Sequence, residues 1–187
     1  MRTIGAWLTF GALAAAALLA PACGGREPLD LPRPPGRLAV TSPAFTDGAA
    51  IPPAYTCDGA DRSPPLRWEG APEGTVAFAI VVDDPDAGGF VHWLAWNLPA
   101  EVDALDSGAS PGGPMPPGTI EAKNDFGRAG YGGPCPPRGK EHRYRFLIYA
   151  LDAPLAAGPG APRDDVEREL ARHAIAAGEL AGRYRRP

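Results

Sequence analysis

Three nearly continuous hydrophobic runs stand out along the chain, at residues 75–82, 91–97 and 143–151. Each run is rich in β-branched or aromatic residues and is bounded by turn-forming residues, a pattern typical of β-strands. Because the runs do not alternate cleanly between apolar and polar positions, they predict central strands that are covered on both faces. The expected fold class is therefore mainly β (α+β).

A helix is predicted near the C-terminal end. Apolar residues recur there on one helical face, at Val166, Leu170 and Ala174. Asp164 and Asp165 are expected to cap its N-terminus and to match the helix dipole, and Gly178 is expected to end it. His173 falls within this helix and is assigned no role, because a single histidine on an amphipathic helix is more often a surface residue than a ligand.

The first 22 residues have the pattern of an export signal. Arg2 is their only charge, an apolar run follows, and small residues precede Cys23. The run is too short and too rich in alanine for a spanning helix. It resembles a bacterial lipoprotein signal with Cys23 as the lipidated residue, although Ala20 stands where that pattern usually has leucine. An ordinary secretory signal is the alternative. Both interpretations predict export to the cell envelope, and the first also predicts a lipid anchor in the membrane.

Residues 23–37 are rich in Pro, Gly and Arg and lack an apolar period, which predicts a disordered tether. One folded domain is then expected over residues 38–187. The 24 glycines and 24 prolines are too many for a helical protein. A net charge of -4 without a long basic block excludes a nucleic-acid-binding surface.

Residues 107–119 contain so many prolines that they cannot form ladder hydrogen bonds, and a surface loop is predicted there. Within it, Gly108, Ser110 and Gly112 match the G-x-S-x-G pattern of hydrolase nucleophiles. In that motif the N–H after the serine donates to the oxyanion, but Pro111 has no N–H. The match is therefore interpreted as accidental.

Two cysteines remain if Cys23 carries a lipid, namely Cys57 and Cys135. An even number of cysteines in an exported protein is the number expected for one disulfide. Two reduced and partly buried thiols are the alternative that the sequence leaves open.

Polar residues that could carry chemistry gather in two segments far apart in the chain. The first hydrophobic run is followed by Asp84 and Asp86, and two glycines then return the chain into the next run at His92. Such a return could bring the acid near the imidazole, although a plain turn stabilised by its own aspartates is the simpler alternative. His142 and Tyr144 are two apart at the start of a strand, so they point to one face and could donate to an anion.

These segments belong to a series of motifs that resembles the phosphatidylethanolamine-binding protein family, also called Raf kinase inhibitor-like proteins, and its bacterial branch in particular. The resemblance spans nearly all of residues 42–184. Its motifs are Thr56-Cys57-Asp58-Gly59, Ser63-Pro64-Pro65-Leu66, Asp84-Pro85-Asp86-Ala87, His92-Trp93, Gly132-Gly133-Pro134-Cys135-Pro136-Pro137, His142-Arg143-Tyr144 and Gly178-Glu179-Leu180-Ala181-Gly182-Arg183-Tyr184. It implies an antiparallel β-sandwich with few helices.

The resemblance also implies a small pocket for phosphate or phosphoryl head groups. The pocket residues of the family fall here on Asp84, His92, Pro134, His142 and Tyr144. Asp86 lies just outside this set. Gly88 stands where the family has proline, which is expected to loosen the rim of the pocket.

Asp84 is expected to accept a hydrogen bond from an imidazole N–H, so that the other ring nitrogen donates to the anion. Backbone N–H groups near Gly132 and Gly133 are expected to complete the cradle, and Pro134 to shape its wall. Because Asp84 and a bound phosphate both favour protonated histidine, the pKa of the histidines should rise on binding. Affinity should then fall as the pH increases through that value.

The sequence thus predicts a binding or regulatory protein without a cofactor, rather than an enzyme. One alternative is a metal-dependent hydrolase with His92, His142 and Asp84 around the metal. Another is an inhibitor of a protease or kinase that acts through the loop at residues 107–119. The expected partners are an anionic small molecule or phospholipid head group, the membrane through the anchor, and a protein target that the sequence does not identify.

Overall fold

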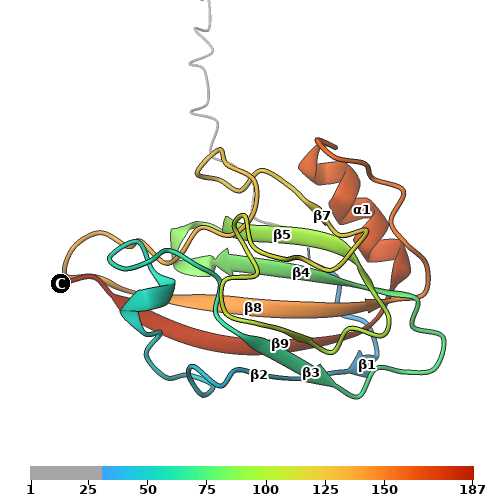
Figure 1. The fold of residues 1–187 in the computed structure, drawn as a ribbon, viewed down its shortest axis with the longest axis horizontal. Helices are drawn as coiled ribbons and strands as arrows, with labels where there is room; N and C mark the ends of the chain where they lie inside the picture. The colour runs from blue at the N-terminus through green and yellow to red at the C-terminus, as the bar shows by residue number, and fades with distance from the viewer. Residues whose placement is uncertain (1–30) are drawn as a thin grey trace, which may run out of the picture.

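A computed structural model describes residues 31–187, which form two β-sheets and an α-helix (Figure 1). Short 3-10 turns, η1 and η2, join some of the strands. In chain order the elements are β1 (Gly36–Arg37), β2 (Ala39–Thr41), η1 (Pro53–Tyr55), β3 (Leu66–Glu69), β4 (Ala77–Asp84), η2 (Pro85–Ala87), β5 (Phe90–Pro99), β6 (Ala104–Leu105), β7 (Ile120–Glu121), β8 (Glu141–Leu151), α1 (Arg163–His173) and β9 (Ala174–Arg185).

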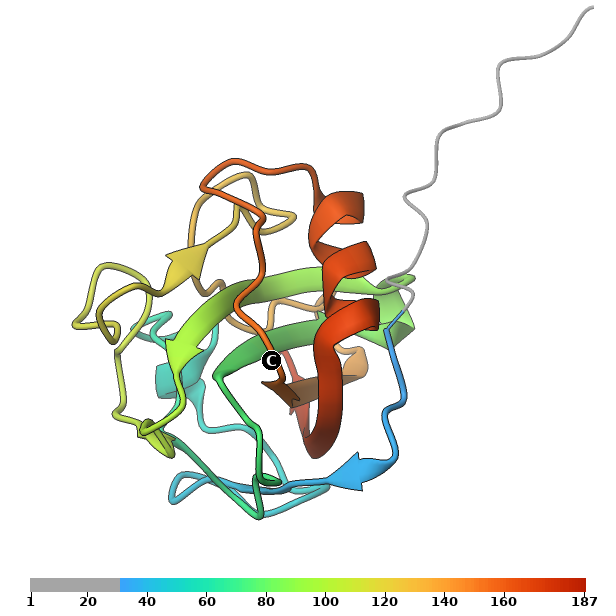
Figure 2. The ribbon, with the colours of Figure 1, turned by 90° about the vertical axis from the view of Figure 1, so that its right-hand side faces the viewer.

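The larger sheet has the strand order β1-β9-β8-β4-β5-β7, and the smaller sheet has the order β2-β3-β6. The long strands are antiparallel to their neighbours, whereas β1 pairs with β9 in parallel. In the view turned by 90°, α1 stands beside the large sheet (Figure 2). The prediction of a mainly β fold with a helix in its C-terminal part is confirmed.

The large sheet separates two hydrophobic cores, because successive residues of a strand point to opposite faces. On β4, Ile80 and Val82 join the core that includes Trp68 of the small sheet, while Ala79 and Val81 join the core that includes residues of α1. We call the first side the inner face of the large sheet and the second its outer face. Every residue of β4 is buried, which confirms the prediction of a central strand covered on both sides.

The C-terminal helix is shorter than predicted, and the chain after it is a strand. α1 ends at His173, and β9 then pairs with β8 along nearly its whole length. Gly178 therefore does not end the helix; it lies within β9, where a Cβ atom would be 2.4 Å from the carbonyl oxygen of Leu38. Asp164 and Asp165 occupy the first turn, but no side chain caps the helix, whose N-cap residue is Pro162.

The ordered chain begins before residue 38. Gly36 pairs with Ala176 and Arg37 pairs with Ala177, and Pro34 is buried, so the last part of the segment expected to be a tether is attached to the large sheet. Residues 1–30, with the expected signal and Cys23, lie outside the described residues. Over residues 31–187, no helix is long and apolar enough to cross a membrane.

The proline-rich loop at residues 107–119 contains no strand and lies mostly at the surface, as predicted, except near its start. Ala109 and Ser110 are buried. The Ser110 hydroxyl donates to Glu121 and accepts the backbone N–H of Tyr131. Because this hydroxyl is enclosed and engaged, its burial agrees with the interpretation of the G-x-S-x-G match as accidental.

Candidate functional site

A small cavity opens on the inner face of the large sheet, where β4 ends and where β5 and β8 begin, at the left of Figure 1. Its volume is about 130 Å³. Three polar residues and a larger apolar group line it: Asp84, His92 and His142, with Ala87, Phe90, Phe126, Cys135, Pro136 and Pro137. The two segments that the sequence singles out therefore meet in one place.

The end of β4 holds Asp84 in position through a short turn. Asp84 is the N-cap residue of η2, and its Oδ1 accepts the backbone N–H of Ala87 at 3.1 Å. Gly88 then adopts a left-handed conformation with φ 68°, which reverses the chain into β5. Asp84 is thus 3% exposed, and its carboxylate is fixed at Oδ1, which leaves Oδ2 to accept from another donor.

His142 provides that donor. Its Nδ1 lies 2.8 Å from Oδ2 of Asp84, and the two side chains are 14% and 4% exposed. A carboxylate accepts at this distance, so the ring carries its proton at Nδ1 and turns Nε2 away from Asp84. The expectation that Asp84 orients an imidazole is met by this pair.

His92 reaches the cavity because of a β-bulge. Val82 pairs with Trp93 and Asp83 pairs with Val91, so the register of β4 and β5 skips His92. Strict alternation from Trp93, which packs in the inner core, would turn His92 to the outer face. The extra residue instead aims it at the inner face, where its ring meets that of Tyr144 edge-on at 5.2 Å.

Burial and a backbone carbonyl set the proton state of His92. Burial lowers the pKa of His92 below its usual value of 6.5, against smaller opposite effects of Gly132 and Asp84. Its Nδ1 lies 2.6 Å from the Gly132 carbonyl oxygen and must donate to it. The neutral ring then has a lone pair at Nε2. The imidazole that Asp84 was expected to hold is thus His142 and not His92.

Tyr144 packs against both imidazoles on the inner face, although it does not itself line the cavity. Its ring is stacked with that of His142 at 6.5 Å between centroids, and the residue is fully buried. Among the described residues its hydroxyl has no hydrogen-bond partner at proper geometry. Burial first, and then the nearby Asp84 carboxylate, raise the pKa of Tyr144 far above its usual value, so the hydroxyl keeps its proton.

Four residues that the sequence analysis placed in or near the site have other roles. The N–H of Gly133 donates to Asp61 at 2.7 Å, and the N–H of Gly132 donates to the His92 carbonyl at 2.9 Å, so neither is free for an anion. The carbonyl of Pro134 accepts the N–H of Cys57, and Pro134 does not line the cavity. Asp86 accepts the N–H of Arg143 and also lies outside the cavity. Gly132, Gly133, Pro134 and Asp86 therefore hold the backbone around the cavity.

One cysteine, Cys135, lines the cavity. Cys57 and Cys135 are joined by a disulfide, with 5.4 Å between their Cα atoms and a sequence separation of 78. The prediction of one disulfide is confirmed, and the two thiols are not reduced. Because Cys135 lines the cavity, this bond ties the loop after residue 132 to the segment that contains η1.

Comparison with known proteins agrees with this geometry. A model of the family described as "Phosphatidylethanolamine-binding protein" matches residues 41–185. The chain belongs to this family. A UPF0098 protein of Pyrococcus abyssi is 47% identical over 80% of this chain and 86% of its own length. The Mycobacterium tuberculosis protein LppC, which bears a lipoprotein name, is 41% identical over 79% of this chain and 72% of its own length.

The likeness extends to solved structures. The crystal structure of Escherichia coli YbcL, described as a new member of the mammalian PEBP family, matches this chain with a TM-score of 0.75. It is 35% identical, and the match covers 81% of this chain and all of YbcL. The large sheet, the small sheet and α1 are thus the fold of this PEBP-family protein.

The site includes aromatic residues that the sequence analysis missed. Phe90 and Phe126 stand at the mouth of the cavity, with ring centroids 4.8 Å apart. One signal was available: Phe126 follows Asn124-Asp125 and precedes a glycine, which is the pattern of a tight turn that would present a side chain. Its distance from the other motifs concealed the connection.

The metal alternative lacks a suitable set of ligands. Over residues 31–187, no group of three His, Cys, Asp or Glu side chains is arranged to hold a metal ion. His92 is committed to Gly132 through Nδ1, and His142 to Asp84. The geometry therefore does not favour a metal-dependent hydrolase.

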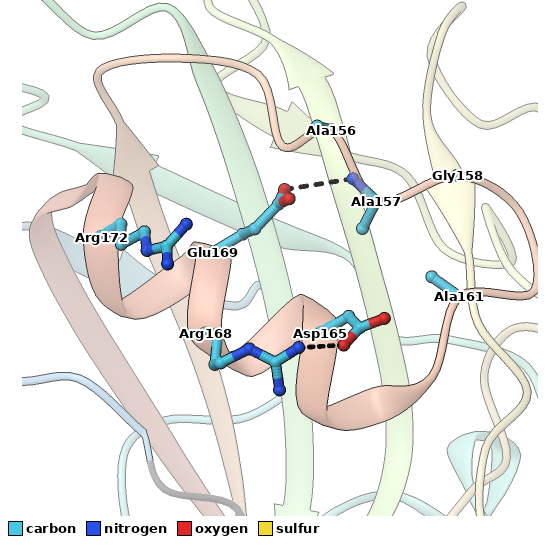
Figure 3. Close-up of a pocket in the computed structure, with 8 residues that line it drawn as sticks. All are labelled: Ala156, Ala157, Gly158, Ala161, Asp165, Arg168, Glu169 and Arg172. Carbon is cyan, nitrogen blue, oxygen red and sulfur yellow. Dashed lines mark hydrogen bonds and ion pairs between the residues drawn. The ribbon is translucent and has the colours of Figure 1, made fainter.

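A wider hollow, of about 470 Å³, lies between α1 and the loop before it, but it offers no comparable site (Figure 3). Arg168 pairs with Asp165 three residues away, and Glu169 accepts the backbone N–H of Ala157. These polar groups are engaged in holding the helix and its loop. His173, at the end of α1, bonds Asp152 at 2.9 Å and lies away from this hollow.

Proposed function

We propose that the cavity binds a phosphate or phosphoryl group through His92, His142 and Tyr144. The observation that carries the proposal is the Tyr144 hydroxyl, which is buried beside two imidazoles without a partner among the described residues. A buried polar group without a hydrogen bond destabilises the fold by about 1–3 kcal/mol, so a ligand that accepts from it offsets that cost. The description of the matched family as phosphatidylethanolamine-binding supports an anionic phosphoryl ligand.

Asp84 has an indirect role in this proposal. A carboxylate in direct contact with a phosphate would repel it, but the Oδ2 atom of Asp84 is occupied by Nδ1 of His142 and its Oδ1 by the N–H of Ala87. Asp84 instead accepts the Nδ1–H of His142 and fixes the orientation of that ring, so that Nε2 is available to the anion. Pro134, Asp86 and Gly133 support the surrounding backbone rather than the ligand.

The size of the cavity fits one head group. At about 30 Å³ per water molecule in the liquid, 130 Å³ corresponds to about four waters. This accommodates a phosphoryl group and not the hydrocarbon chains of a lipid. The remainder of any larger ligand would extend out of the mouth.

We propose binding rather than catalysis. The hydroxyl that stands next to the histidines is that of Tyr144, and its raised pKa keeps it protonated at neutral pH. A protonated phenol is a hydrogen-bond donor and a weak nucleophile. The loop at residues 107–119 is largely exposed, which is compatible with the inhibitor alternative but is no specific support for it.

Replacing Tyr144 with Phe tests the proposal. Tyr144→Phe should weaken the binding of inorganic phosphate about tenfold, because one donor is lost, while the free energy of unfolding of the empty protein stays unchanged or rises slightly. Tyr149→Phe is the matched control, since Tyr149 is buried in the outer core. Calorimetric titration and denaturant unfolding measure the two effects. Unchanged phosphate affinity in Tyr144→Phe would refute the proposal.

We further propose export to the cell envelope and a lipid on Cys23, which lies outside the described residues. The lipoprotein name of the similar M. tuberculosis protein supports this. Metabolic labelling with a radioactive fatty acid tests it: the wild-type protein should carry label in the membrane fraction, and Cys23→Ala should not. Label that remains on Cys23→Ala would contradict the proposed site.

A further inference from the structure

The mouth of the cavity presents an aromatic side chain whose placement nothing in the protein's own core requires. Phe126 is 45% exposed, one of the few large hydrophobic residues with this exposure among residues 31–187. Single exposed apolar residues are common and need no explanation by themselves. Phe126, however, also lines the cavity and lies edge-on to His92, with ring centroids 5.3 Å apart.

The Phe126 ring is held in place from below. A Cβ atom at Gly132 would lie 2.6 Å from a ring carbon of Phe126, so only glycine at that position lets the ring lie where it does. The ring of Phe90 meets the Phe126 ring edge-on, with 4.8 Å between the two centroids. Although it is half-exposed, the Phe126 ring is therefore held in one position by its contacts with Gly132 and Phe90.

The turn that carries Phe126 is also fixed. The buried side chain of Asn124 accepts the backbone N–H of Phe126 at 3.0 Å and donates to the Gly130 carbonyl at 2.8 Å. Next to it, Oδ2 of Asp125 accepts the N–H of Val91 at 2.8 Å. Val91 immediately precedes His92 in β5, so the turn is fastened to the strand that supplies the imidazole.

The surroundings of the ring define what it can contact. The guanidinium of Arg128 lies over the Phe126 ring, 5.6 Å from its centroid, and Arg128 pairs with Asp61. The positive charge of Arg128 would repel a cationic substituent on the ligand but not an apolar one. Pro136 and Pro137 continue the apolar rim. The cavity is therefore polar at its base and apolar at its mouth.

We infer that the ligand is a phosphate ester with an apolar substituent, and that Phe126 selects it over free phosphate by packing against that substituent. This inference rests on the proposed function, since it places the phosphoryl group at His92 and His142. A membrane lipid and a soluble aryl or alkyl phosphate share this chemistry. A single ester substituent that leaves the base of the cavity must pass Phe126, because the ring stands at the mouth.

The preference for phenyl phosphate over inorganic phosphate tests the inference, with both affinities measured by calorimetric titration. Contact between two aromatic rings, together with the apolar area that it buries, should make phenyl phosphate bind roughly tenfold more tightly to the wild-type protein. Phe126→Ala should reduce this ratio to about one, whatever its effect on either affinity alone. Phe126→Leu, which keeps an apolar side chain on Gly132, should retain part of the ratio.

Val76→Ala is the control, because Val76 is also exposed, at 47%, but adjoins the opposite end of β4. It should leave the ratio unchanged. Equal affinity of the wild-type protein for the two ligands, or an undiminished ratio in Phe126→Ala, overturns the inference and leaves the proposed function standing. Failure of the wild-type protein to bind either ligand removes the proposed function as well.

Vesicles distinguish the two sources of such an ester. If the source is a membrane lipid, vesicles that contain phosphatidic acid, a phosphate ester without a cationic substituent, should release bound phenyl phosphate from the wild-type protein. Release would support an ester whose hydrocarbon lies outside the cavity. If vesicles do not release it while the preference for phenyl phosphate depends on Phe126, a soluble ester is supported.

Discussion

Two neighbouring aspartates at the end of β4 show how one strand can serve two different purposes. Asp83 points to the outer face, is 1% exposed and binds Arg145 through both carboxylate oxygens. Asp84 points to the inner face and binds His142. Arginine is always charged, and here it donates two hydrogen bonds to the carboxylate. A histidine that bonds a carboxylate through one ring nitrogen has a second nitrogen that can bind a ligand. The outer pair therefore stabilises the sheet, and the inner pair can bind a ligand.

The inner side also depends on long-range connections that the outer pair does not need. Its walls come from segments near residues 57, 84, 126 and 135, while Asp83 and Arg145 sit opposite each other in the register of β4 and β8. Stability and binding should thus respond differently to changes on the two sides.

The largest effect is expected from the disulfide. Replacing Cys57 and Cys135 with serine should lower the free energy of unfolding by about 4 kcal/mol, because a loop of 78 residues is no longer closed in the unfolded chain. It should also weaken phosphate binding, since Cys135 lines the cavity. Denaturant unfolding and calorimetric titration measure both. A smaller loss than that of the Asp83 variant below would show that the cross-link is not the main support of the inner side.

On the outer side, Asp83→Asn should cost about 3 kcal/mol of unfolding free energy, since it leaves Arg145 without its charged partner in a mostly buried place. Asp83 also raises the pKa of Arg145, in keeping with a strong pair. Phosphate affinity should stay within about twofold of wild type. The double variant Asp83→Asn with Arg145→Met serves as control and should recover part of the stability. A large loss of affinity in Asp83→Asn would erase the distinction between the two faces.

On the inner side, Asp84→Asn should weaken phosphate binding by about tenfold or more, because His142 loses the carboxylate that orients its ring. Stability should change by only about 1 kcal/mol, because the asparagine oxygen can still accept the N–H of Ala87. Titration calorimetry beside thermal unfolding separates the two quantities. The comparison fails if Asp84→Asn unfolds the protein but binds phosphate normally.

The smallest expected effect is the pH dependence of binding. Burial lowers the pKa of His92 in the empty site, and an anion at Nε2 raises it again, so binding takes up a proton. Affinity should therefore rise as the pH falls from the raised pKa to the lowered one, by at most about tenfold per pH unit, and should level off below that range. Sulfate is the sharper probe because it brings no proton of its own.

His92→Gln should make the sulfate affinity less dependent on pH, and this comparison of two titration series checks the assignment. An identical pH profile in the two proteins would assign the proton uptake to another group. His92 would then not be the group that takes up a proton when the anion binds.

The central strands and the polar ends that face the cavity were predictable, because apolar runs, Asp84 and the pair His142 and Tyr144 follow local patterns. β9 was not, since its alanines and glycines resemble a fading helix, and its pairing with β8 is a long-range effect. The bulge that turns His92 inward leaves no mark in the alternation of residues. The engagement of Gly133 by Asp61, 72 residues away, could not be seen locally either.

The position of β9 also constrains how the chain reaches this structure. β9 is made of residues 174–185, yet it lies between β1 and β8 in the large sheet. Until these residues are available, β8 has one unpaired edge, and Gly36 and Arg37 have no strand to join. Closure of the sheet must therefore wait for the final strand, and a chain cut before residue 174 would be an open template for aggregation.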